Sequence, residues 1–133
     1  MIPTILLVDD EADIVSANCR MLEEYGYKVL AAKSSDDALA IFARNGQSID
    51  VVVTDIMMPG MNGMELIRKL KKIAPEIKVI ATSGLGRNMG GSPQAAEMES
   101  LNVINFLRKP YTVQNLLTTL YEALDEKQMV QYH

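Results

Sequence analysis

A chain of 133 residues suits one domain, whose core can be stable without disulfides or metal. Hydrophobic residues make up 48% of the chain and charged residues 23%, and the longest apolar runs are far too short to span a bilayer. The net charge of −4 and the lack of tryptophan argue against nucleic-acid binding, so we expect neither that activity nor membrane insertion.

The chain alternates strand-like and helix-like patterns five times. Runs of β-branched and aliphatic residues predict strands, and they cover residues 4–8, 28–32, 49–55, 78–83 and 104–107. Apolar residues at helical spacing follow four of these runs, and Ser92-Pro93 indicates the start of the remaining helix, after the run 78–83. Ser34, with Asp37 three residues later, is typical of a capping box, and Thr112 is expected to cap the last helix. Segment 58–63 predicts a turn.

The nature of the strands indicates the fold class. Continuous apolar runs are typical of strands that helices cover on both faces, so the alternation predicts an α/β fold with a parallel sheet. Right-handed crossovers then place all strand–helix loops at one edge, where ligands bind in such folds. Four polar motifs fall at this edge, and they are Asp9-Asp10, Asp55, Thr82-Ser83 and Lys109-Pro110.

The acidic motifs indicate a metal site. Carboxylates a few ångströms apart repel by about 1–4 kcal/mol per pair. Protonation relieves that repulsion, or a hard cation such as a partly hydrated Mg²⁺ does. Alternatively, Asp10 and Glu11 simply stabilise the N-terminus of the first helix. Asp55 and Lys109 at the same edge favour the metal site, and Lys109 is expected to pair with a carboxylate.

The order and spacing of these motifs resemble those of receiver domains of bacterial two-component response regulators, across about residues 4–124. The matching segments are 9–10, 55 with 58–63, 79–84 and 106–111. The resemblance implies a flavodoxin-like sheet with strand order 2-1-3-4-5. We therefore expect a receiver domain in residues 1–125 and a C-terminal tail in residues 126–133.

The resemblance also implies roles for individual residues. Asp55 matches the phosphoacceptor, which takes a phosphoryl group from a sensor histidine kinase or a phosphotransfer protein. Asp10 matches a direct Mg²⁺ ligand and Asp9 one that acts through water, while Asp55 and the backbone carbonyl of Met57 complete the protein ligands. Lys109 matches the lysine that binds a phosphoryl oxygen, and its bond to the following proline is expected to be cis.

A conformational switch follows from the same resemblance. The hydroxyl that senses the phosphoryl group is Ser83 or Thr82, and the small residue that follows favours Ser83. Phe106 is expected to rotate from exposed toward buried when that hydroxyl is engaged, although it also suits an ordinary core aromatic. Asn102-Val103 and the glycine-rich connector 84–91 depart from the family pattern near its usual output face, so we assume no standard dimer and leave the oligomeric state and the downstream protein target open.

The residues around the site argue against two other functions. An aspartyl-nucleophile phosphohydrolase would need an acid where this chain has Met57, and the acids after the first strand would repel a flavin phosphate. We expect no enzyme activity beyond Mg²⁺-dependent self-phosphorylation and slow autodephosphorylation, because Met57 and Leu85 cannot orient a hydrolytic water. The chain also resembles a C-terminal receiver of a hybrid sensor kinase. The lone Cys19 and the absence of a secretory signal pattern predict a cytoplasmic location.

Overall fold

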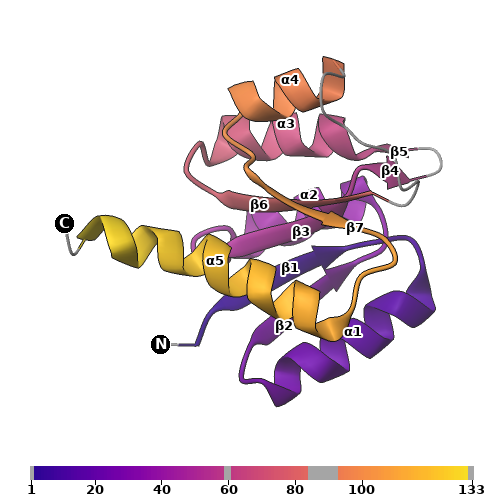
Figure 1. Ribbon diagram of the computed structural model, residues 1–133. Coiled ribbons are helices and arrows are strands. Elements are labelled where there is room, and N and C mark those ends of the chain that lie inside the picture. The colour runs from indigo at the N-terminus through magenta and orange to yellow at the C-terminus, as the bar shows by residue number, and fades with distance from the viewer. Residues whose placement is uncertain (1, 59–60, 84–92, 132–133) are drawn as a thin grey trace.

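The computed structural model describes residues 2–58, 61–83 and 93–131 (Figure 1). Its main sheet has five parallel strands in the order β2-β1-β3-β6-β7. These strands are β1 (Thr4–Val8), β2 (Lys28–Ala32), β3 (Val51–Asp55), β6 (Lys78–Ser83) and β7 (Asn105–Arg108). Counted among themselves along the chain, they have the order 2-1-3-4-5, so the predicted fold class is confirmed.

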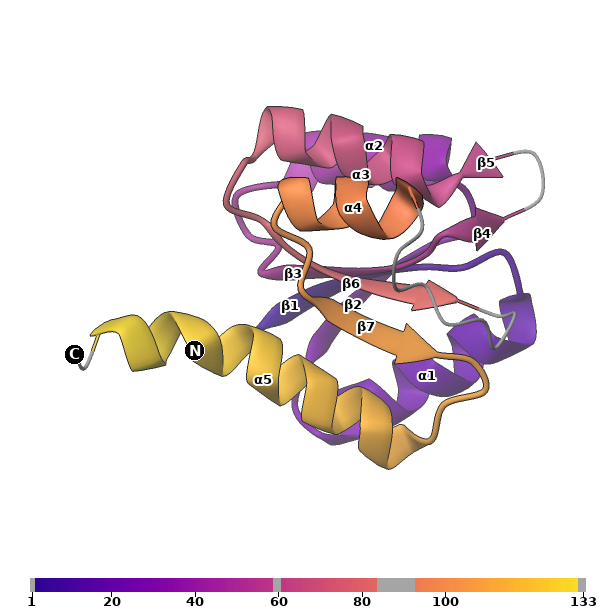
Figure 2. The same cartoon turned by 45° about the horizontal axis from the view of Figure 1, so that its top comes forward.

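Helices cover both faces of this sheet. They are α1 (Ala12–Glu24), α2 (Ser35–Asn45), α3 (Gly63–Ile73), α4 (Pro93–Ser100) and α5 (Val113–Gln131). Helices α2, α3 and α4 lie on one face, and α1 and α5 lie on the other (Figures 1 and 2). No helix in the parts of the chain that the structure describes is long and apolar enough to cross a membrane.

Alternate residues of each central strand supply two separate apolar clusters. In β1, Leu6 and Val8 pack on the side of α2 and α3, whereas Ile5 and Leu7 pack on the side of α1 and α5. Side chains of adjacent strand residues point to opposite faces, so a strand that is covered twice must be apolar at nearly every position. This is why the strands read as continuous apolar runs in the sequence.

Local signals set several of the helix ends. The Ser34 hydroxyl accepts a hydrogen bond from the backbone N–H of Asp37 at 3.1 Å, as the capping pattern predicts. The Thr112 hydroxyl does the same for Asn115 at 3.0 Å at the start of α5. Gly26, which follows the C-cap residue Tyr25 of α1, has a φ of 92°, a conformation that is strained for other residues.

The structure adds detail to two predicted segments, and a third lies outside the residues that it describes. The predicted tail 126–133 begins inside α5, which continues to Gln131 because residues 125–131 contain no glycine or proline to stop it. The predicted turn at 58–63 includes part of a small hairpin of β4 (Met57–Met58) and β5 (Met61–Asn62). The connector 84–91, which includes Leu85, lies outside the described residues.

Candidate functional site at the carboxyl end of the sheet

The register of the sheet brings the predicted motifs to one place. Val8 of β1 pairs with Thr54 of β3, so the residues that follow, Asp9 and Asp55, are neighbours. On the other side of β3, Asp55 pairs with Thr82 of β6. Ser83 pairs with Arg108 of β7, which places Lys109 just beyond the end of β6. The acids, the hydroxyls and the lysine therefore share one edge, as the fold class predicts.

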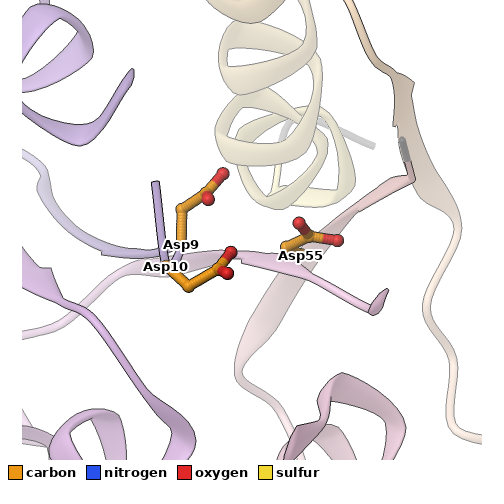
Figure 3. Close-up of side chains that lie close together, drawn as sticks. All are labelled: Asp9, Asp10 and Asp55. Carbon is orange, nitrogen blue, oxygen red and sulfur yellow. The ribbon is translucent and has the colours of Figure 1, made fainter. Parts of the chain in front are cut away.

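Asp9, Asp10 and Asp55 form a cluster of three carboxylates beside the ends of β1 and β3 (Figure 3). One oxygen from each lies within 4.8 Å of the others, a spacing that suits a single metal ion. Asp9 and Asp55 are buried and Asp10 is exposed, so the cluster faces solvent on the side of Asp10. The structure thus places in one group the three acids predicted from sequence to act on metal.

Lys109 lies between the two buried acids. Its ammonium donates hydrogen bonds to Oδ2 of Asp9 at 2.6 Å and to Oδ2 of Asp55 at 3.0 Å, and its side chain is 10% exposed. Burial lowers the pKa of this ammonium, but the two carboxylates raise it by more, so the net pKa is well above its usual range. Lys109 is therefore a fixed positive charge at any physiological pH.

Backbone contacts hold the lysine and the first acid in place. The backbone N–H of Lys109 donates to the Ser83 carbonyl at 2.7 Å, and the bond from Lys109 to Pro110 is cis, as expected. Oδ1 of Asp9 accepts from the backbone N–H of Glu11 at 2.9 Å. Both ends of the Lys109–Asp9 ion pair are thus fixed by main-chain hydrogen bonds.

Glu11 is a site residue that the sequence analysis missed. It occupies the N-cap of α1 but makes no capping hydrogen bond with its side chain, and its carboxylate lies 3.6 Å from the Lys109 ammonium. The alternative in which the acids after β1 serve only the helix is therefore wrong for Glu11. An acid next to two aspartates was the available signal, but the position of the lysine was needed to interpret it.

Gly63 is a second residue that the site requires. It begins α3, and a Cβ atom there would lie 2.3 Å from the carbonyl oxygen of Asp55 and 2.5 Å from Cα of Ile56. Such distances are far below van der Waals contact, so the backbone of Asp55 keeps its position because residue 63 has no side chain.

Of the predicted switch residues, Ser83 pairs with Arg108, directly before Lys109, and Phe106 lies three residues before that lysine in the chain. Thr82 is buried within β6, whereas Ser83 is half-buried at the end of that strand. Phe106 is 48% exposed in β7, so it is not an ordinary core aromatic in this structure. Met57, the predicted source of a carbonyl ligand, lies in β4 two residues after Asp55.

A parallel α/β domain with acids and a buried lysine at this edge is the architecture of a phosphoacceptor domain in signalling. The family model for the response regulator receiver domain matches residues 5–121. The chain therefore belongs to the response regulator receiver domain family, and it acts as a receiver in phosphorelay signal transduction.

Individual relatives agree with this assignment. The crystal structure of a receiver domain protein from Clostridium thermocellum has a TM-score of 0.84 and 37% identity, with 97% of this chain and 99% of that chain covered.

The sensor kinase CckA of Brucella abortus (strain 2308) is 36% identical over 124 residues, which are 93% of this chain and 13% of the relative. The C4-dicarboxylate transport transcriptional regulatory protein DctD of Rhizobium meliloti (strain 1021) is 30% identical over 131 residues, 96% of this chain and 26% of the relative. The chain thus spans 13% to 26% of these two curated relatives.

Proposed function

We propose that Asp55 is the phosphoacceptor of this receiver domain. The observation that carries the proposal is its carboxylate, buried at the end of β3 beside two further acids and 3.0 Å from the Lys109 ammonium. One carboxylate oxygen attacks the phosphorus of a phosphohistidine, forming an O–P bond as the N–P bond breaks in line. The imidazole leaves with the electron pair of the broken bond, and the product is an acyl phosphate.

Lys109 supports this transfer by neutralising charge on the phosphoryl group. An ammonium has three N–H donors, and in this structure two carboxylates accept from it. When Asp55 carries the phosphoryl group, one donor shifts from the carboxylate to a phosphoryl oxygen. The two carboxylates raise the pKa of Lys109 in this structure, and the negative charge of a phosphoryl group would likewise favour the charged form.

The acidic cluster fits a divalent cation. Three carboxylates and one lysine have a formal charge of −2, which a divalent ion balances, and the donors are the hard oxygens that Mg²⁺ prefers. We assign Asp10 and Asp55 as direct ligands, Asp9 as a ligand through water, and the Met57 carbonyl as the remaining protein ligand. Bound Mg²⁺ would offset negative charge on the transferring phosphoryl oxygens.

Ser83 and Phe106 form the proposed switch. The Ser83 hydroxyl would donate a hydrogen bond to the phosphoryl group, which favours a state in which Phe106 turns inward from its half-exposed position. The two residues lie in neighbouring strands, since β6 pairs with β7. Such a population shift would be detected as a change in the ring signals of Phe106 on phosphorylation.

The partners are proposed from chemistry and similarity. A sensor histidine kinase or a phosphotransfer protein would supply the phosphoryl group, and a downstream protein would bind the switched form, in the cytoplasm. Similarity to the sensor kinase CckA favours a second arrangement, in which this domain receives the phosphoryl group as part of a hybrid kinase. Apart from Mg²⁺-dependent self-phosphorylation and slow autodephosphorylation, we propose no enzyme activity.

Intact mass after incubation with acetyl phosphate and Mg²⁺ tests the proposal. The wild type should gain one phosphoryl group, and Asp55→Asn or a chelator should abolish the gain. Asp36→Asn, a change of the same kind at an exposed position in the first turn of α2, should leave it intact. An adduct that persists in Asp55→Asn would overturn the assignment.

A further inference from the structure

Tyr111 lies two residues after Lys109 and has no part in the function proposed above. Its hydroxyl accepts a hydrogen bond from Nδ2 of Asn18 at 2.9 Å, across 93 residues of sequence. Asn18 belongs to α1, and the Tyr111 ring packs against the apolar cluster on the side of α1 and α5. This contact therefore joins α1 to the segment that connects β7 to α5.

Each residue of this hydrogen bond is close in sequence to one residue of the Lys109–Asp9 ion pair. Asp9 lies three residues before α1, and Asn18 is six residues into that helix, about 9 Å along its axis. At the other end of the hydrogen bond, Tyr111 lies two residues after Lys109, and the ammonium of Lys109 is 2.6 Å from Oδ2 of Asp9. The Asn18–Tyr111 hydrogen bond, the Lys109–Asp9 ion pair and the two chain segments between them form a closed loop. A displacement at the hydrogen bond therefore also displaces the ion pair.

Hydrogen bonds also fix the segment at both of its ends. The backbone N–H of Lys109 is bound to Ser83 of β6, and Thr112 caps α5. The Asn18–Tyr111 hydrogen bond lies between these two anchors and holds the segment toward α1. Burial raises the pKa of the Tyr111 phenol, and the charges of Lys109 and Asp9 also act on it, which agrees with a position close to the site.

We infer that Asn18 and Tyr111 are a positioning pair that sets where the Lys109 ammonium lies relative to Asp9 and Asp55, and so sets the rate at which Asp55 accepts a phosphoryl group. This inference rests on the proposed function. A lysine side chain has four flexible methylene groups, so the position of its ammonium depends on where the backbone of that residue lies. A small displacement of a charge-stabilising group lowers the rate of transfer without removing the group.

The test is a double-mutant cycle with Tyr111→Phe and Asn18→Ala. Both variants should fold, because Phe keeps the ring and Ala favours the helix. The measurements are the rate of phosphorylation by acetyl phosphate per folded molecule, the Mg²⁺ affinity, and the Lys109 Nζ signal in NMR spectra. Tyr27→Phe is the matched control, since that half-buried tyrosine packs on the same apolar cluster but lies next to β2.

Each single variant should slow phosphorylation by about threefold to tenfold, the equivalent of losing one hydrogen bond, and the double variant should be no slower than either. Mg²⁺ affinity should stay within about twofold of the wild type, because no assigned ligand is changed. The Lys109 Nζ signal should shift in both single variants and not in Tyr27→Phe.

Three results would overturn the inference: wild-type rates in both variants, additive effects, or a loss confined to one of them. A purely structural role would lower stability and leave both the rate per folded molecule and the Nζ signal unchanged. If the wild type itself gains no phosphoryl group, the proposed function fails, and the pair is then judged by the Nζ signal alone.

Discussion

The two ends of the sheet each hold a lysine whose ammonium is largely removed from water, yet the two ammonium groups respond in opposite ways. At the carboxyl end, Lys109 donates to Asp9 and Asp55 and its pKa is raised. At the amino end, Lys71 of α3 is buried, and its ammonium donates to the Ile77 carbonyl at 2.7 Å, just before β6. Burial, aided by the charge of Lys78, lowers the pKa of Lys71.

The difference shows what the partners contribute. Burial disfavours the charged form of both lysines, and a neutral carbonyl does not reverse that effect, whereas two carboxylates do. The amino end therefore uses a lysine as a structural tie between a helix and a strand. The carboxyl end uses one to balance charges that would otherwise repel.

Replacing each lysine in turn by methionine should produce the largest difference in the free energy of unfolding between the two ends of the sheet. Lys109→Met should lower the free energy of unfolding by about 3–5 kcal/mol at pH 7 in EDTA, because two buried carboxylates lose their ammonium. Lys71→Met should cost only about 1 kcal/mol, the net value of one hydrogen bond. Urea unfolding measures both, and equal losses would contradict the comparison. Added Mg²⁺ should recover part of the loss for Lys109→Met alone.

A pair of glycines tests the same contrast through sterics. Gly63→Ala would push a Cβ atom against the Asp55 backbone, and Gly46→Ala would push one to within 2.7 Å of the Phe42 carbonyl oxygen at the other end. Each should lower the free energy of unfolding by about 1–3 kcal/mol. Phosphorylation by acetyl phosphate, measured by intact mass per folded molecule, should slow only in Gly63→Ala. A similar slowing in Gly46→Ala would mean that the two ends are coupled.

The pH dependence of stability should have opposite signs for the two lysines. A lowered pKa means that the unfolded chain holds the proton of Lys71 more tightly, so this residue makes stability rise with pH up to its unfolded value of about 10.4. A raised pKa means that the contribution of Lys109 is complete below about 10.4 and is lost as the pH rises through its folded value.

The difference in free energy of unfolding between wild type and each Lys→Met variant isolates these contributions. From pH 8 to 10 the difference should grow for Lys71→Met and stay constant for Lys109→Met. Urea unfolding at several pH values measures both differences, and a difference for Lys109→Met that grows with pH as the one for Lys71→Met does would refute the assigned partners.

The smallest expected effect concerns the hydrolytic water at the carboxyl end. Met57 follows Asp55 by two residues, and an apolar side chain there cannot orient a water by hydrogen bonding. Met57→Asn should speed loss of the phosphoryl group by about threefold to tenfold, roughly the value of one hydrogen bond. Decay of the phosphorylated mass after removal of acetyl phosphate measures this rate. An unchanged or slower decay would count against the role of Met57.

The parallel α/β class and the proximity of Asp9, Asp55 and Lys109 could be predicted from local signals, whereas the strand order followed from the family resemblance. Apolar runs mark strands that are covered on both faces, and parallel strands bring their carboxyl ends to one edge. Asp9, Asp55 and Lys109 each follow such a run directly, so their proximity needs no knowledge of side-chain packing.

The remaining features depend on tertiary contacts that no local pattern reveals. The hydrogen bonds from Asn18 to Tyr111 and from Lys71 to Ile77 join residues whose types are common on helix surfaces and in loops. The half-exposed position of Phe106 follows from the place of β7 at the edge of the sheet. These contacts appear only when the packing of whole elements is known.

The ion pair between Asp9 and Lys109 also has a consequence for when the site can exist. It joins residues that are 100 positions apart, and β7, which directly precedes Lys109, is the last strand of the sheet to be synthesised. Contacts of this kind form late, after the intervening loops have closed. A nascent chain that has emerged only as far as β6 therefore has its acids but not its lysine, so the complete charge cluster can form only after Lys109 has emerged.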